Sequence, residues 1–519
     1  LKGHGGLTNN VSGSSTSTGS FGDLRVAGNS IAIDAASVLA IDGTAGGGNN
    51  IIIGDSAGVD LIGSSGTYNT IIGREAGAKI STQGGNIHIG WYTGNTSENQ
   101  QNTFIGNEAG RFLDNGTGYN VAIGNTTMRA NTGGGNDASD NTAIGAGALG
   151  NITDGDNNTA IGRNAGNALT TGGNNVFVAR NAGLSVTSGT ENVIIGYNAG
   201  DAMTDINYAV IVGAYAGSAI NSTDANGTIA IGLEAARDLT SGQGNTAIGH
   251  QAFKVGTEID FNTVIGYQAG MDLSGSSGTQ AEGNTFVGYK AGTDVTTGNF
   301  NTAVGYHALL ENKTGENNTA IGQGALLYST GSRYNTAVGT NAGGWGCGNS
   351  TYNTFVGDSA GGIYKTVGTG WGVDGGSMGG NVLMGSYAGY YIGAGNNNTA
   401  GVTAIGITAG YYTTGSYNTF VGSKAGRGTQ NTSAPYSYGE NNVAIGAGAL
   451  EYADRTDDSV VIGRYAARLQ IRLEQAVVIG REALWTSTSG QQLGTVAIGY
   501  KALYGSIGNT EYSVAIGYR

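Results

Sequence analysis

The chain has 519 residues, of which 99 are glycine and one is proline, and only 11% are charged. Collagen is excluded because glycine does not recur at every third position, and simple disorder is disfavoured because 39% of the residues are apolar and recur in register. The net charge of −13 argues against nucleic acid or an anionic membrane as a partner, and no apolar run is long enough to span a bilayer. The single cysteine, Cys347, excludes an intrachain disulfide.

Residues 1–27 are rich in glycine, serine and threonine and are predicted to form a separate N-terminal segment. Residues 28–519 are predicted to form one repeat domain. Within it a five-residue core, usually Asn-Thr-Ala-Ile-Gly, occurs 26 times from residue 50 to residue 517, and 12 of the 25 spacings are 17 residues. A fixed period with occasional insertions is typical of a solenoid.

Each position of the core has a restricted composition. The second residue is β-branched in all 26 copies, the fourth is Ile or Val in 25, and the fifth is Gly in 25. β-branched residues at alternate positions predict a short strand with one packed face, and the glycine permits a corner. The pattern therefore predicts an all-β fold, a parallel β-solenoid of about 26 coils. The first residue is Asn in 19 copies, which fits either an amide ladder between coils or a simple turn residue.

The third position of the core is predicted to set the oligomeric state. It is apolar in 25 of 26 copies, as at Ala320 and Phe355, and only His88 departs from this. Its side chain points away from positions two and four, which are expected to pack inside the coil. We therefore expect the third-position stripe to face another copy of the chain, because an exposed apolar stripe of this length is not tolerated on a monomer. A homotrimer or a higher filament follows.

Two families resemble these repeats. Asn301–Leu309, which reads NTAVGYHAL, and Asn262–Gly270, which reads NTVIGYQAG, are similar to repeats in phage and bacterial tail-fibre-domain proteins. Ser513–Gly517, which reads SVAIG, resembles the head repeat of YadA-like trimeric autotransporter adhesins. The second resemblance implies a trimer of left-handed parallel β-rolls.

Catalytic and metal-binding patterns are weak. His4, His88, His250 and His307 lie in different coils without metal-ligand spacing, so we expect no metal, no cofactor and no enzyme. The adjacent Asp457 and Asp458 fit an acid pair or a cation site, but an exposed turn is the preferred interpretation.

Insertions are the preferred binding candidates, because extra residues in a solenoid project as loops. They are expected near 125–140, 358–384, 390–401 and 427–441. Aromatic residues at loop tips suit sugar rings or protein anchors, although they also fit a role in covering neighbouring coils. The ligand-binding candidates are Tyr364, Lys365, Trp371, Asp374, Tyr436 and Tyr438.

These features predict an extracellular fibre, on a cell surface or a virion, that adheres to a host or binds a cell-surface glycan or protein receptor. A purely structural filament or shaft is the alternative, and a polysaccharide-cleaving tailspike is a third possibility. Ice binding requires a regular flat array of threonines. The second position is Thr in only 13 copies, mixed with Val and Ile, which fits packing better.

Overall fold

The computed structural model describes residues 24–26, 29–31, 37–42, 49–61, 66–114, 118–130, 136–275, 281–344, 348–362, 378–392, 399–429, 439–505 and 508–518. The chain divides into two compact units. The first consists of residues 1–181 and 187–189, and the second of residues 182–186 and 190–519.

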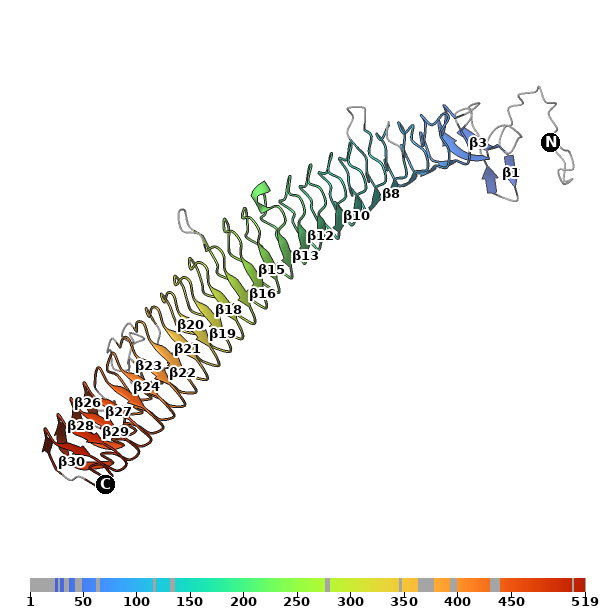
Figure 1. Ribbon diagram of the computed structural model, residues 1–519. Helices are drawn as coiled ribbons and strands as arrows, with labels where there is room; N and C mark the ends of the chain where they lie inside the picture. Colours follow the sequence, from blue (N-terminus) through green and yellow to red (C-terminus); the bar gives the residue numbers. More distant parts are fainter. Residues whose placement is uncertain are drawn as a thin grey trace. The chain divides into compact units, whose positions relative to one another are not determined.

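The first unit is built mainly from three-residue parallel strands, one per coil, that follow an antiparallel edge of two six-residue strands (Figure 1). Strand β3 pairs antiparallel with β4 and so covers the edge of the first parallel strand. The strands are β1 (Leu24–Val26), β2 (Asn29–Ile31), β3 (Ser37–Asp42), β4 (Asn50–Asp55), β5 (Thr70–Ile72), β6 (Ile87–Ile89), β7 (Thr103–Ile105), β8 (Val121–Ile123), β9 (Thr142–Ile144), β10 (Thr159–Ile161) and β11 (Val176–Val178).

The second unit continues the same pattern with one short 3-10 helix, η1 (Thr223–Ala225). Its parallel strands are β12 (Val193–Ile195), β13 (Val210–Val212), β14 (Ile229–Ile231), β15 (Thr246–Ile248), β16 (Thr263–Ile265), β17 (Thr285–Val287), β18 (Thr302–Val304), β19 (Thr319–Ile321), β20 (Thr336–Val338), β21 (Thr354–Val356), β22 (Val382–Met384), β23 (Thr403–Ile405), β24 (Thr419–Val421), β25 (Val443–Ile445), β27 (Val460–Ile462), β29 (Val477–Ile479), β31 (Val496–Ile498) and β33 (Val514–Ile516). A second parallel sheet consists of β26 (Arg455–Asp457), β28 (Leu469–Glu474), β30 (Thr486–Leu493) and β32 (Thr510–Glu511).

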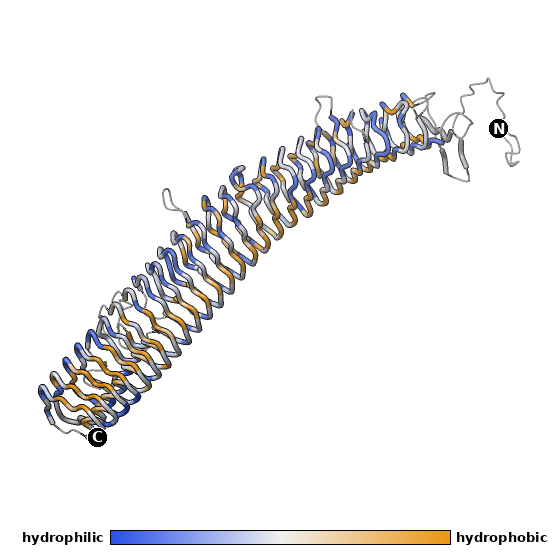
Figure 2. The backbone as a smooth tube through the Cα atoms, in the orientation of Figure 1, coloured by the Kyte–Doolittle hydropathy of each residue, from blue (hydrophilic) through white to orange (hydrophobic). Residues whose placement is uncertain are grey.

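Equivalent positions of successive repeats pair with each other. Thr302 pairs with Thr319, and Ala303 pairs with Ala320. The same register recurs through both units, which gives a β-solenoid of about 24 turns spaced near 17 residues. The predicted fold class is therefore confirmed. Hydrophobic residues gather along the strands, and hydrophilic residues gather in the turns (Figure 2).

The first-position asparagines form an amide ladder inside the coils. The Oδ1 atom of Asn301 accepts hydrogen bonds from the backbone N–H and from Nδ2 of Asn318, both at 3.0 Å. Asn318 in turn accepts both bonds from Asn335 at 3.1 Å. These side chains are buried, so the ladder satisfies polar groups that water cannot reach. The ladder alternative is confirmed.

The predicted orientation of the third position is wrong. Ala320 and Phe355 are fully buried inside the coil, whereas Thr319 is half-buried and Ile321 is exposed. The reason is the alternation of the strand, because the buried first-position Asn lies on the same face as position three. Positions two and four consequently point out of the solenoid, and the third-position stripe is not available to another chain.

The interior is filled by complementary volumes. Where position three is Phe, the fourth residue after the corner glycine is also Gly, as for Phe286 with Gly292 and Phe420 with Gly426. A Cβ atom at Gly292 would lie 2.6 Å from the Phe286 ring. Where position three is Ala, that place is often filled by a larger residue, such as the buried Leu326 in the coil of Ala320. Such reciprocal sizes are what a close-packed core requires.

The predicted insertions are described only at their flanks, because residues 131–135, 363–377, 393–398 and 430–438 lie outside the described residues. None of the described segments forms a helix with the length and hydrophobicity needed to cross a bilayer.

Candidate functional site

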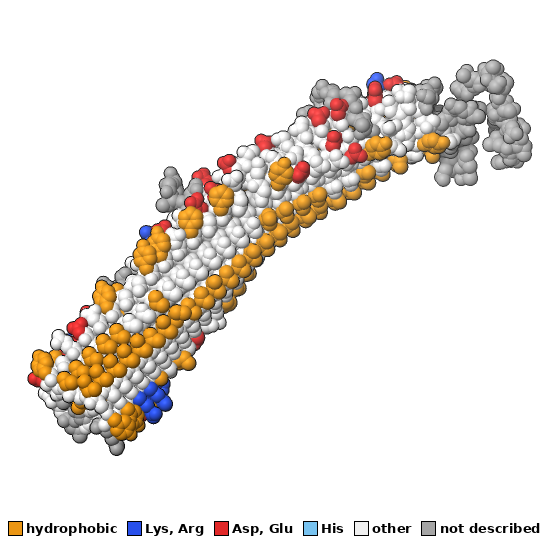
Figure 3. All heavy atoms as spheres, in the orientation of Figure 1, with side chains coloured by type: hydrophobic (Ala, Val, Ile, Leu, Met, Phe, Trp, Pro, Cys, Tyr) orange, Lys and Arg blue, Asp and Glu red, His pale blue; other side chains and the backbone are white. Residues whose placement is uncertain are grey.

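The outward face of the long parallel sheet is the most extensive candidate surface. Position two of each strand is mostly half-buried, whereas many position-four side chains are 36–40% exposed, among them Ile321, Ile405 and Ile445. In the second unit these side chains form a continuous hydrophobic band along the strands (Figure 3). Each strand of the band in the second unit is three residues long and is followed by a glycine, and the residue before that glycine is β-branched except at Met384.

The band also contains a regular row of hydroxyl groups. Position two is Thr in seven successive strands, β15 to β21, from Thr246 to Thr354. Position four of the same strands is Ile or Val. With coils about 4.8 Å apart, this part of the face has one hydroxyl and one branched apolar side chain per coil.

The six ligand-binding candidates predicted from sequence, Tyr364, Lys365, Trp371, Asp374, Tyr436 and Tyr438, all lie outside the described residues. Cys347 and His4 lie outside them as well.

The three described histidines are separated from one another. His88 occupies position three of β6, fully buried against Phe104, with a ring-centroid distance of 5.0 Å. Burial without a hydrogen-bond partner at either ring nitrogen lowers the pKa of His88 to about 3. His250 and His307 belong to a column of stacked rings on the surface. Across the described parts of the chain, no three His, Cys, Asp or Glu side chains gather in a way that suits a metal ion.

Asp457 and Asp458 line an open hollow of about 710 Å³ beside the second sheet. Asp457 pairs with Arg455 at 3.2 Å, and Asp458 accepts a hydrogen bond of 3.1 Å from the Asn441 side chain. Both carboxylates therefore already have partners. Asp458 is exposed and lies in a bend, as the exposed-turn interpretation expects, whereas Asp457 is the last residue of strand β26.

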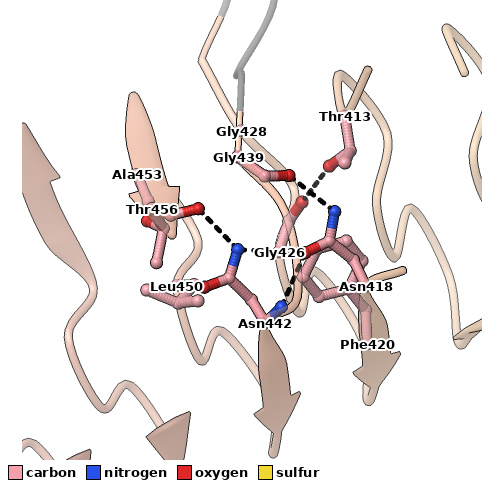
Figure 4. A pocket seen from close by; sticks show the side chains of 10 residues that line it. All are labelled: Thr413, Asn418, Phe420, Gly426, Gly428, Gly439, Asn442, Leu450, Ala453 and Thr456. Carbon is pink, nitrogen blue, oxygen red and sulfur yellow. Dashed lines mark hydrogen bonds between the residues drawn. The ribbon is translucent and has the colours of Figure 1, made fainter. Parts of the chain in front are cut away.

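A smaller cavity lies inside the solenoid next to one of the predicted insertions (Figure 4). Its volume is about 30 Å³, room for roughly one water molecule. Asn418 and Asn442 of the amide ladder border it, and Asn442 Nδ2 donates to Asn418 Oδ1 at 2.9 Å. The cavity is thus a packing defect beside a long coil, too small for a ligand.

Two sets of aromatic side chains were missed in the sequence analysis. One set follows the corner glycine and forms a surface ladder, in which Tyr267, Tyr289 and Tyr306 stack at 5.3 and 5.1 Å with nearly parallel rings. The other lies further round the coil, where burial and neighbouring tyrosines raise the pKa of Tyr411 to about 12. The sequence contains a signal for both sets, because these residues recur at a fixed offset from the corner glycine.

Comparisons with known proteins give no relatives: no protein-family model, no curated protein and no solved structure matches this chain.

Proposed function

We propose that the chain is the subunit of a homotrimeric extracellular fibre, exposed on a cell surface or a virion, that attaches to a surface, and that it is not an enzyme. The observation that supports this most is the outward band formed by positions two and four. Copies of the chain would associate through this band, in place of the third-position stripe that the sequence suggested.

The energy available from the band is large. Burying an isoleucine side chain completely contributes about 2 kcal/mol, so a side chain that is 40% exposed retains about 0.8 kcal/mol. Summed over the strands of the second unit, this reaches on the order of 10 kcal/mol per chain. A monomer seldom leaves a continuous apolar surface of this extent in water, and a symmetric assembly covers it with equivalent surfaces.

Two further readings use the same fold. In the first, the fibre is only a shaft, because the repeats themselves select no ligand. In the second, the chain remains monomeric and the outward face of its sheet binds ice. The outward row of seven threonines favours that reading, because it orders hydroxyl and methyl groups at a fixed spacing.

Charged substitutions on the outward band test the proposal. A triple variant with Ile321→Glu, Ile405→Glu and Ile445→Glu should fold, because these side chains reach solvent in the single chain. It should sediment as a monomer, because each unpaired charge buried in an interface raises the free energy of the assembly by several kcal/mol. In a symmetric trimer this cost occurs in every chain.

The matched control replaces three exposed apolar residues outside the band, Val255→Glu, Tyr352→Glu and Tyr417→Glu. This control should remain trimeric. If the band variant is also trimeric, the proposed interface is wrong. The unmodified chain could instead be a monomer that shows thermal hysteresis, which means that ice grows only below its melting temperature. That result would replace the trimer proposal with the ice-binding one.

A further inference from the structure

The last coils of the second unit differ in charge from the rest of the chain. Residues 420–519 contain nine of the 23 Lys and Arg residues but only eight of the 36 Asp and Glu residues. Residues 1–419 therefore contain 14 basic and 28 acidic residues. The last hundred residues are therefore nearly neutral, with a formal charge of +1, whereas the rest of the chain has a formal charge of −14.

Six of these cations form one connected surface with aromatic rings, which we name the C-terminal basic patch. Its cations are Lys424, Arg427, Arg464, Arg468, Arg481 and Lys501. They follow the strand corners of four coils, those of Gly422, Gly463, Gly480 and Gly499, and the intervening coil of Gly446 supplies Glu451. Adjacent coils are about 4.8 Å apart along the stacking direction.

The centre of the patch is fixed by a buried carboxylate. Glu451 is 1% exposed, and its Oε2 atom accepts a bond of 2.7 Å from Arg468 Nε. The Arg468 guanidinium lies 4.7 Å from the ring centre of Tyr465 and 5.0 Å from that of Trp485. The arginine and the rings therefore hold each other in place before any ligand arrives.

The edges of the patch have cations available to solvent. Arg464 is exposed, lies over the Tyr465 ring at 4.8 Å and forms no ion pair with a described residue. Arg481 has a side chain that is 57% exposed, whereas its partner Glu482 is only 14% exposed. The carboxylates of Glu451 and Glu482 are both nearly buried, so the solvent-exposed surface of the patch is mainly positive.

We propose that the C-terminal basic patch binds an acidic polysaccharide. Aromatic rings suit the apolar C–H faces of sugars, and arginines suit carboxylate groups bidentately. The coil spacing is close to the length of one sugar in an extended glycan, so successive acidic sugars would meet successive coils. The inference rests on the proposed attachment function, and it identifies acidic polysaccharide as the material to which the fibre attaches.

The experiment measures binding of the full chain to polygalacturonate, with dextran as the neutral polymer, at low and high salt. We expect polygalacturonate to bind, dextran not to bind, and affinity to fall as salt rises. The double variant Arg464→Gln with Arg481→Gln should bind at least tenfold more weakly. The control Lys290→Gln with Lys313→Gln removes the same charge from the acidic part of the chain and should bind like the unmodified chain.

Several results overturn the inference: no binding of polygalacturonate, equal binding of dextran, or equal weakening by both double variants. Binding of DNA or of phosphatidylglycerol vesicles in place of polygalacturonate also overturns it. The mass of the assembly is measured on the same samples, so a failed trimer and a failed ligand give different results.

Discussion

Removing one step of the amide ladder should destabilise the coils around it. Asn318 Nδ2 donates to Asn301 Oδ1 at 3.0 Å and to the Ser332 carbonyl at 2.7 Å, and Asn318 Oδ1 accepts two bonds of 3.1 Å from Asn335. Asn318→Ala deletes these four bonds and leaves the buried backbone N–H of Asn335 without its acceptor. At about 1 kcal/mol for each of the four hydrogen bonds, the loss is about 4 kcal/mol.

Hydrogen exchange measured by mass spectrometry provides the assay, because coil-to-coil contacts are local and the effect should be confined to neighbouring coils. Amides of β18 to β20 should exchange about 1000-fold faster, which corresponds to about 4 kcal/mol. The control is Asn317→Gly, which changes an exposed asparagine at positive φ to the residue best suited to that backbone. If Asn318→Ala exchanges like the control, the ladder contributes little and the reasoning is refuted.

Other predictions concern the interior and its pH dependence. His88 has a folded pKa near 3, below the unfolded value of 6.5, so its neutral burial stabilises the fold above pH 6.5 and this stabilisation is lost as pH falls towards 3. In the unmodified chain this pH-dependent stability amounts to about 2 kcal/mol between pH 6.5 and 5. His88→Phe should abolish it, so the hydrogen-exchange rates of β6 and β7, corrected for intrinsic rates, should be the same at both pH values. Gly292→Ala should lower the thermal midpoint, because the added Cβ meets Phe286 and φ is +59°. The double variant Gly292→Leu with Phe286→Ala, which copies the pair Leu326 and Ala320, should be more stable than Gly292→Leu alone. Equal stability of the two would show that the backbone alone is responsible.

The sequence was sufficient for much of the fold, because the same requirement recurs in every coil. Twenty-six copies of one core, nearly all with a β-branched pair and a final glycine, specify the strand, the corner and the register together. The inward face was predicted wrongly because alternation alone does not distinguish the two faces of a strand. The deciding signal was present, since Phe104, Phe286, Phe355 and Phe420 each occur with a glycine that makes room for the ring. A glycine is needed beside each Phe only if the ring lies in the close-packed interior of the coil.

The second sheet and the C-terminal basic patch were harder to predict. Strand β28 has the sequence LQIRLE, in which Leu473 and Gln470 are buried and Arg472 is half-buried, so its pattern departs from the repeat. The basic patch depends on residues from five coils that become neighbours only when the coils stack. Glu451 illustrates this, because a single carboxylate in a turn gives no sign of burial until Arg468 and Lys424 are brought to it.

The mass of the unmodified chain in solution tests the central claim most directly. Sedimentation equilibrium or native mass spectrometry should give three times the 52.0 kDa of one chain, with no monomer at micromolar concentration. A mass of 52.0 kDa at every concentration would contradict the account, because the outward band of β-branched residues would then remain exposed to water along the whole face.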